Sequence, residues 1–265
     1  MIDTKIFYIN LAHRTDRRDN VIKELDRFKL NKQAERFNAV YGKKLDIDNI
    51  PDCIVTKKGK KDALDDKLRV YVPLTKGGIG VALSHMALYK KIIEEDLDYA
   101  LILEDDITLV EDFIEQFNTI VYHCPKDLDM LFLGYHNSSI KYINKDLNEY
   151  ICKSDKVFGL FGYIVSNKGA HKLLSIFPIT EQIDSEISNN MNIFNCYLVV
   201  PDNRIILSDE SSIYSKFGTD IQIRDDQNPV MEGFNSFDLS YNKKNIIIFF
   251  VLIIMICLCI KYKCY

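Results

Sequence analysis

Three consecutive carboxylates directly follow a strongly apolar stretch of the chain. The segment YALILEDDITLVEDF runs from Tyr99 to Phe113 and contains Glu104, Asp105 and Asp106. If the apolar residues form a buried strand, side-chain alternation directs Glu104 and Asp106 to one side and Asp105 to the other. Mg²⁺ or Mn²⁺ commonly binds one or two carboxylates together with phosphate oxygens. The pattern predicts a divalent metal that carries a diphosphate, and a turn with solvated acids is the alternative.

A second polar group follows the first apolar run of the chain. In INLAHRTDR, Asn10 closes the run, and Arg14 and Arg17 stand where a helix is expected to begin. Helix N-termini and arginine side chains both bind phosphate. On their own these arginines would be ordinary surface residues. Together with the three acids they favour a nucleotide diphosphate as the ligand.

A histidine and two further acids could also take part in chemistry. His85 lies about a quarter-turn from the main apolar stripe of an expected helix, so it is either a core histidine or a ligand-binding one. Asp184 and Glu186 open a short helix after PITEQI. Acids at such a place either complement the helix dipole or include a general base.

Strands and helices alternate along the part of the chain that carries these residues. Apolar runs predict strands at 5–11, 35–40, 99–103, 129–135, 159–166, 196–201 and 204–207. Helical periodicity predicts one helix capped by Thr15 or Asp16, a second across 75–97, and two more that begin at 167 and at 184. This alternation favours an α/β fold with a mainly parallel central sheet. In such sheets ligands bind at the carboxyl ends of strands, where the acids stand.

Two other stretches have a less regular pattern. Residues 46–68 hold a basic run followed by an acidic one, which predicts a solvated loop, with a binding patch as the alternative. Gly77 and Gly78 stand at the start of the long helix, where paired glycines permit a neighbouring backbone or a ligand to approach closely.

The composition restricts the class of protein. The chain has 265 residues, 47% hydrophobic and 27% charged, which suits one α/β domain with a sizeable core. A formal net charge of −4 argues against a nucleic-acid partner. Seven cysteines without CxxC or Cys/His spacing argue against a zinc site or a disulfide framework and favour a reducing compartment.

An uncharged apolar stretch, IIIFFVLIIMICLCI, occupies Ile246–Ile260 between flanking lysines. A helix of this length spans only ~22 Å of a ~30 Å hydrocarbon core, but lysine stems reach outward and a bilayer can thin. We expect a folded head at 1–221, a polar linker at 222–244 and a single-pass membrane anchor at 245–262, with a buried terminal helix as the alternative. The N-terminal residues show no secretory signal, so the head is expected in the cytosol.

Six segments together resemble glycosyltransferase family 25. IFYINLAHRTDR, AERFNAVYG, LTKGGIGVALSHMALYKKI, YALILEDDITL, FGYIVSNKGAHKLL and PITEQIDSEI occur in the order, and at roughly the spacing, of that family. The resemblance covers about residues 4–215. The family includes lipopolysaccharide and lipooligosaccharide galactosyltransferases and procollagen galactosyltransferases.

The resemblance implies a GT-A-like nucleotide-sugar-binding fold, a UDP-sugar donor, dependence on Mn²⁺ (or Mg²⁺) and inversion at the anomeric carbon. Most often the donor is UDP-galactose. The acceptor would be a glycan, a lipid-linked glycan or a collagen-like protein. The matching positions in this chain are Asn10, Arg14 and Arg17 on the nucleotide side, Ser84 and His85 in the ALSH helix, Glu104, Asp105 and Asp106 at the metal motif, and Asp184 at a late acidic position.

These matches predict a role for each group. The metal is expected chiefly on Asp106, with Glu104 or Asp105, where it offsets charge on the departing UDP. For the base that deprotonates the acceptor hydroxyl, Asp184 is the first choice and Glu186 the second. The remaining group, the histidine of the ALSH helix, is expected to orient donor or acceptor.

The chain also departs from the family pattern. Gly78 stands where the family usually has Glu, Val81 stands where it often has Cys, and DSE at 184–186 replaces two adjacent acids. The alternatives are a catalytically degenerate membrane protein that binds a nucleotide sugar, a metal-dependent phosphohydrolase, and a membrane scaffold without chemistry.

Overall fold

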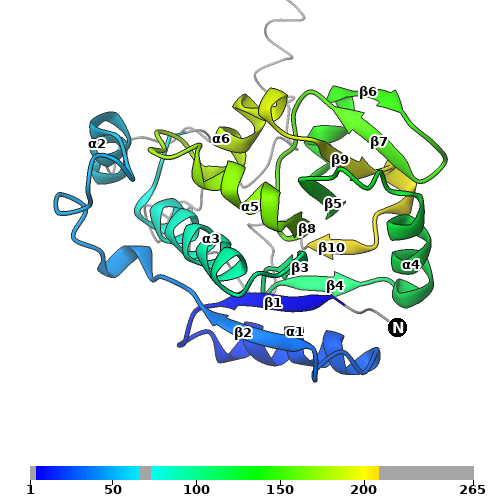
Figure 1. Ribbon diagram of the computed structural model, residues 1–265. Coiled ribbons are helices and arrows are strands. Elements are labelled where there is room, and N and C mark those ends of the chain that lie inside the picture. The colour runs from blue at the N-terminus through cyan, green and yellow to red at the C-terminus, as the bar shows by residue number, and fades with distance from the viewer. Residues whose placement is uncertain (1–3, 66–72, 209–265) are drawn as a thin grey trace, which may run out of the picture. The chain divides into compact units, whose positions relative to one another are not determined.

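A central eight-stranded sheet organises the part of the chain that the structure describes (Figure 1). The structure is a computed structural model and describes residues 4–65 and 73–208. The strands follow the order β2-β1-β3-β8-β5-β9-β7-β6 across the sheet. In that order their bounds are Ala34–Asn38, Lys5–Asn10, Tyr99–Leu103, Gly162–Ser166, Met130–Gly134, Cys196–Val199, Ile151–Ser154 and Ile143–Asp146. A separate two-stranded sheet pairs β4 (Ile107–Leu109) with β10 (Ile206–Ser208).

The central sheet is mixed, so the prediction of a mainly parallel sheet is wrong. β1 pairs in parallel with β2 and β3, and β5 with β9, but β8 is antiparallel to both β3 and β5. β7 is antiparallel to β9 and β6. The parallel start follows from the helical crossover between β1 and β2. Between β5 and β8 the chain instead makes the β6–β7 hairpin, and β8 re-enters the sheet in the opposite direction.

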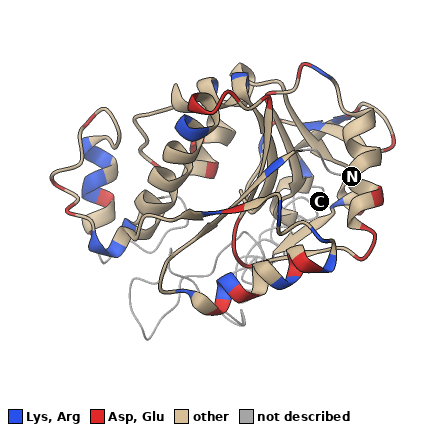
Figure 2. Ribbon diagram, turned by 60° about the horizontal axis from the view of Figure 1, so that its bottom comes forward, with Lys and Arg blue, Asp and Glu red and all other residues tan. Residues whose placement is uncertain are grey.

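Helices lie on two sides of the parallel strands (Figures 1 and 2). α1 (Thr15–Arg27) packs against β1 and β4, and α3 (Lys76–Glu94) packs against α5 (Asn167–Leu174) on the other side of β1. The other helices are α2 (Lys57–Leu64), α4 (Phe113–His123), α6 (Ile183–Asn189) and the short 3₁₀ helices η1 (Gly42–Lys44), η2 (Asn137–Tyr142), η3 (Met191–Ile193) and η4 (Pro201–Asn203). Residues 100–103 of β3 are fully buried, which explains their continuous apolar run.

The long helix α3 lies directly on the chain that follows β2. A Cβ on Gly80 would stand 2.5 Å from the Val40 carbonyl oxygen, and one on Gly42 would stand 1.8 Å from the Lys76 carbonyl oxygen. One turn after Gly80, the Ser84 hydroxyl accepts a hydrogen bond from the Val40 backbone N–H at 2.8 Å. Only glycine permits this approach, so these positions fix one wall of the site described below.

The predicted close approach at the paired glycines is confirmed at Gly78. A Cβ there would lie 2.1 Å from Oε1 of Gln182, whose side chain covers the start of α3. The backbone N–H of Gly78 donates to the Thr75 hydroxyl at 2.9 Å, which caps the helix. The family that this sequence resembles usually has a glutamate at position 78, and such a side chain would displace Gln182.

Several local predictions differ from the structure. The stretch predicted as a solvated loop contains α2, which Thr56 caps by accepting from the Gly59 N–H at 3.1 Å. Neither Thr15 nor Asp16 caps α1, because Arg14 occupies that position without a side-chain cap. The short strands β4, β6 and β7 were not predicted. Each has only three or four residues, too few for a clear alternation.

The predicted membrane anchor at 245–262 and the linker at 222–244 lie outside the described residues. Within 4–65 and 73–208, no helix combines the length and the apolar character needed to cross a bilayer. The anchor therefore stays a prediction from the sequence.

Candidate functional site

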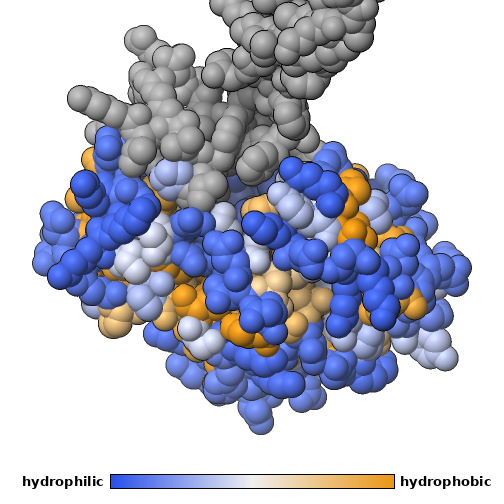
Figure 3. All heavy atoms as spheres, turned by 90° about the horizontal axis from the view of Figure 1, so that it is seen from above, coloured by the Kyte–Doolittle hydropathy of each residue, from blue (hydrophilic) through white to orange (hydrophobic). Residues whose placement is uncertain are grey.

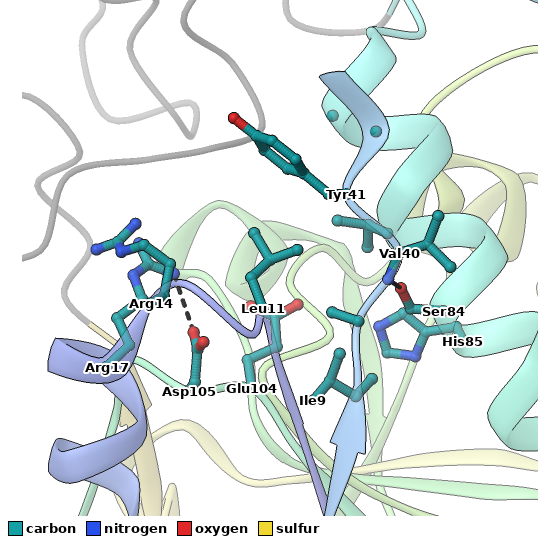
Figure 4. Close-up of a pocket in the computed structure, with 14 residues that line it drawn as sticks. Ile9, Leu11, Arg14, Arg17, Val40, Tyr41, Ser84, His85, Glu104 and Asp105 are labelled. Atoms are coloured by element: carbon teal, nitrogen blue, oxygen red, sulfur yellow. Dashed lines mark hydrogen bonds and ion pairs between the residues drawn. The ribbon is translucent and has the colours of Figure 1, made fainter. Parts of the chain in front are cut away.

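A pocket opens where the parallel strands β1 and β3 end (Figure 4). The empty space within it is about 610 Å³, part of which is open solvent. The walls come from the end of β1 and the start of α1, from residues 39–42 after β2, from α3 and from the end of β3. Because neighbouring parallel strands end at the same edge of a sheet, polar side chains after β1 and β3 meet here.

Asp105 is held by two side chains from the first part of the chain. Its Oδ2 accepts a hydrogen bond from Asn10 Nδ2 at 2.7 Å, and its Oδ1 accepts one from Arg17 at 3.0 Å. The residue is only 6% exposed. Burial raises the pKa of Asp105, and the Arg17 cation opposes that rise. The protein thus supplies a cation of its own to this acid.

The predicted alternation of the three acids does not hold, because β3 ends at Leu103. Glu104 and Asp105 both line the pocket, and Asp106 Oδ2 lies 3.2 Å from Arg17. Residues beyond the end of a strand no longer follow its two-residue period. Glu104 and Asp105 therefore share the pocket wall, and Asp106, which does not line the pocket, meets Asp105 at the Arg17 guanidinium.

The acids fit a divalent metal at Asp106 and Glu104 better than at Asp105. Asp106 Oδ1 is buried and has no hydrogen-bond partner among the described residues, so it offers a hard oxygen ligand. Both oxygens of Asp105 already accept hydrogen bonds. Within 4–65 and 73–208, no group of three His, Cys, Asp or Glu side chains could hold a metal by itself. A metal here would need oxygens from a ligand as well, which is usual for Mg²⁺ and Mn²⁺ beside phosphates.

The arginines form the cationic side of the pocket. Arg14 and Arg17 both line it. Arg14 makes two hydrogen bonds to Asp16, at 3.0 and 2.9 Å, and these lower the pKa of Asp16 to about 2. A third arginine, Arg36 on β2, donates to Asn10 Oδ1 at 2.9 Å and so fixes the asparagine that holds Asp105. Phosphate oxygens would find positive charge and helix-terminal N–H groups on this side.

His85 and Ser84 lie on α3, across the pocket from the arginines in Figure 4. His85 is 1% exposed, and burial lowers its pKa to about 3, so the ring is neutral at pH 7. Its Nδ1 lies 2.8 Å from the Tyr163 hydroxyl. The histidine is thus buried in the core and also lines the pocket, so the structure does not separate the two alternatives left open by the sequence. The Ser84 hydroxyl donates to the Gly80 carbonyl at 2.7 Å, so its hydrogen bonds are structural.

Asp184 and Glu186 do not line the pocket. Asp184 accepts from the backbone N–H groups of Gly159 at 3.3 Å and Ser185 at 2.8 Å. Glu186 Oε1 accepts from the N–H groups of Thr180 at 2.5 Å and Glu181 at 2.9 Å. Both acids are half-buried at the start of α6 and stabilise the backbone there.

Residues 159–161 connect Asp184 with the acid cluster. The N–H of Gly159 donates to Asp184, and the Phe161 carbonyl, two residues later, accepts from the Glu104 N–H at 3.0 Å. Asp184 therefore stands beside the segment that borders the site, although not in the pocket wall.

The sequence did not point to Arg36, Tyr89 or Tyr163, which hold the site residues. Arg36 donates to Asn10, and the two tyrosine hydroxyls lie 2.9 Å apart beside His85. A weak signal for Tyr163 existed, because its hydroxyl lies in the middle of a mostly apolar strand, GYIVS. A buried hydroxyl needs a partner, but the sequence does not say which one.

Comparisons with known proteins give a consistent picture. The family described as glycosyltransferase family 25 (LPS biosynthesis protein) matches residues 3–187. The chain is 30% identical to procollagen galactosyltransferase 1-B of Xenopus laevis over 185 residues, which is 68% of this chain and 29% of the relative. It is 26% identical to human procollagen galactosyltransferase 2, over 68% of this chain and 28% of the relative.

A viral relative is also similar. The procollagen lysyl hydroxylase and glycosyltransferase of Acanthamoeba polyphaga mimivirus is 25% identical over 222 residues, 75% of this chain and 24% of the relative. The chain thus spans less than a third of the length of these curated relatives.

Similar solved structures include two glycosyltransferases. One is a Drosophila galactosyltransferase in complex with manganese, UDP-Gal and xylobiose, with a TM-score of 0.36, 10% identity and coverage of 81% of this chain and 74% of the other. The second is GlyE of Streptococcus pneumoniae, with a TM-score of 0.39, 11% identity and coverage of 84% and 59%. At such low scores we draw no conclusion from the structural likeness. The match over residues 3–187 covers well over half of the sequence, and on that ground the chain belongs to glycosyltransferase family 25.

Proposed function

We propose that this chain is a metal-dependent, inverting glycosyltransferase with a GT-A-like donor site. It would transfer a hexose, with galactose as the first choice, from a UDP-sugar to a hydroxyl group. The observation that supports this most is the pocket at the ends of β1 and β3, where arginines and carboxylates meet inside the region that matches the family. The names of the relatives support galactose and a collagen-like acceptor, and a glycan or lipid-linked glycan is the other acceptor class.

Asp106 and Glu104 would hold Mn²⁺ or Mg²⁺. The buried, unpartnered Oδ1 of Asp106 supports this assignment, as does the position of Glu104 in the pocket wall. When bound, the ion offsets the negative charge that develops on the departing diphosphate. Asp105 keeps its hydrogen bonds to Asn10 and Arg17 and positions the arginine rather than the metal.

Arg14 and Arg17 would bind the phosphates of the donor. Their side chains line the pocket at the start of α1, where the helix dipole adds to their charge. Each arginine is already oriented by an acid, Arg14 by Asp16 and Arg17 by Asp105. A side chain oriented in this way loses less entropy when the ligand binds.

Asp184 is our first choice for the base, and Glu186 is the second. The acceptor oxygen bonds to the anomeric carbon as the bond to the diphosphate oxygen breaks, and the hydroxyl proton passes to the carboxylate. Attack from the face opposite the diphosphate inverts the anomeric carbon. The connection from Asp184 through 159–161 to Glu104 supports this assignment. Glu186 is engaged by two backbone N–H groups through a single oxygen, which favours a structural role.

A second candidate is a protein that binds a nucleotide sugar without transferring it. Two observations favour it. Neither candidate base lines the pocket, and the described part of the chain contains no three-residue metal cluster.

A transfer assay with the full chain tests the proposal. The chain is incubated in mild detergent with Mn²⁺, a panel of UDP-sugars, and either a hydroxylysine-containing collagen peptide, a lipid-linked glycan or no acceptor. We expect one acceptor to gain a hexose in the inverted configuration, and we expect EDTA to stop the reaction. Binding of UDP without transfer to any acceptor would favour the second candidate, and absence of UDP binding would contradict both.

A further inference from the structure

Three buried side chains form a hydrogen-bonded chain that leads to the pocket. The hydroxyls of Tyr89 and Tyr163 lie 2.9 Å apart, and the Tyr163 hydroxyl lies 2.8 Å from His85 Nδ1. Both tyrosines are fully buried, on α3 and β8 respectively. The second ring nitrogen of His85, Nε2, is buried without a hydrogen-bond partner among the described residues. In Figure 4 the ring extends from α3 toward the pocket that it lines.

Counting donors selects one direction for these hydrogen bonds. If Tyr89 donates to Tyr163 and Tyr163 donates to His85 Nδ1, both hydroxyl protons are used and the ring proton lies on Nε2. In the opposite direction Nδ1 donates, and the Tyr89 proton then has no acceptor among the described residues. Nε2 would also lack a donor. The first direction leaves one unpaired group, an N–H at the pocket wall, whereas the second leaves two.

We propose that Tyr163, supported by Tyr89, holds His85 as the neutral Nε2–H tautomer, and that this N–H donates a hydrogen bond to an oxygen of the bound nucleotide sugar. The identity of the ligand rests on the proposed function, but the tautomer does not. Tyr163 is the positioning residue, Tyr89 contacts only Tyr163 and not the His85 ring, and His85 is the residue that touches the ligand.

The environment keeps all three groups neutral. Burial raises the pKa of both tyrosines and lowers that of His85 to about 3. An uncharged N–H suits a hydroxyl or carbonyl oxygen of the nucleoside or sugar. The phosphates would instead face Arg14 and Arg17 across the pocket. The two walls would thus recognise different parts of one ligand.

Nitrogen NMR tests the tautomer directly. The full chain is labelled with ¹⁵N-histidine, and the His85 signals are assigned by their absence from His85→Gln. We expect the signals of a neutral ring with the proton on Nε2, and we expect the Nε2–H signal to shift when UDP-galactose is added with Mg²⁺, which is diamagnetic. A proton on Nδ1 would overturn the inference. Binding of UDP-galactose without any shift at Nε2–H would overturn the ligand contact.

Two matched variants separate positioning from simple structural support. Tyr163→Phe and Tyr89→Phe each remove one buried hydroxyl from this series of hydrogen bonds and keep the aromatic ring of the side chain. We expect Tyr163→Phe to give a mixture of tautomers and to weaken UDP-galactose binding about three- to tenfold, the effect of one hydrogen bond. Tyr89→Phe should keep the Nε2–H tautomer and bind UDP-galactose within about twofold of the wild type, because Tyr163 still donates to Nδ1.

The outcomes distinguish this inference from the proposed function. Equal effects of the two variants on the tautomer would overturn the proposed direction of the hydrogen bonds from Tyr89 through Tyr163 to His85. Should a variant unfold, the tautomer measured in the wild type still decides. If the wild type has the Nε2–H tautomer but does not bind UDP, the proposed function and the ligand contact fail while the tautomer stands. If UDP binds and the proton is on Nδ1, the inference alone fails.

Discussion

The acids at 104–106 and at 184–186 have similar compositions, but different groups hold their carboxylates. Asp105 is held by the side chains of Asn10 and Arg17, and Asp106 keeps a buried oxygen without a partner in the described residues. In contrast, Asp184 and Glu186 accept their hydrogen bonds from backbone N–H groups.

The difference follows from the elements that carry the acids. The first group follows a buried strand whose parallel neighbour ends at the same edge, so side chains from distant segments meet there. The second group opens a helix, where free backbone N–H groups attract any nearby carboxylate. Side-chain partners can be exchanged for a ligand, whereas loss of a backbone partner disturbs the local fold. This difference supports the proposal that the first group binds the ligand and that the second mainly stabilises the backbone, with Asp184 as the exception to be tested.

The largest expected effect is that of Asp106→Ala. Loss of the metal ligand should lower hexose transfer by about a thousandfold or more, because bound metal supplies several kcal/mol of transition-state stabilisation. Thermal unfolding should change little. The matched control is Glu111→Ala, which removes an acid whose side chain is 96% exposed, five residues later. Equal transfer rates in the two variants would contradict a metal-binding role for Asp106.

Asp184→Asn should have the second-largest effect on the transfer rate. Loss of a general base typically lowers the rate about 100- to 10,000-fold. The asparagine oxygen can still accept from Gly159, and only the N–H of Ser185 loses its acceptor, so the fold and UDP binding should be retained. Transfer is measured under saturating donor, and UDP affinity is measured by calorimetry. A wild-type rate would assign Asp184 to support alone, as the backbone contacts by themselves suggest.

Glu186→Ala should act on stability instead of rate. Removal of the carboxylate leaves the N–H groups of Thr180 and Glu181 without their acceptor, at an expected cost of about 1–2 kcal/mol in the free energy of unfolding. Urea unfolding of the full chain measures it. A larger loss of transfer than in Asp184→Asn would make Glu186 the base.

The pH dependence of the free energy of unfolding tests the opposite wall of the pocket, where His85 lies. The pKa of His85 is lowered from 6.5 to about 3 by burial, so between these values the unfolded chain binds a proton that the folded chain does not. Stability from this group is therefore present above about pH 6.5 and is lost as the pH falls toward 3, by up to ~1.4 kcal/mol per pH unit.

Unfolding measured between pH 7 and 4 tests this expectation. His85→Gln should show a shallower fall in stability than the wild type. The neighbouring groups Tyr89 and Tyr163 stay protonated in this range, because burial raises the pKa of both. Parallel slopes would contradict a neutral buried ring.

Much of the site could be predicted from the sequence, and the limits have physical causes. Asn10 and the three acids stand at or just after the ends of two clearly apolar strands, and Arg17 follows in the first turn of the next helix, so the sequence pattern alone indicates that they meet. The direction of β8 depends on the β6–β7 hairpin, whose short strands carry little periodicity. The hydrogen bonds from Arg36 to Asn10 and from Tyr163 to His85 depend on contacts between distant segments, which no local pattern contains.

Calorimetry of UDP binding, with and without Mn²⁺, tests the central claim most directly. In the full-length wild type we expect Mn²⁺ to tighten UDP binding at least tenfold, and we expect Asp106→Ala to remove this dependence while Glu111→Ala keeps it. Equal UDP affinity with Mn²⁺ and with EDTA in the wild type would contradict the account.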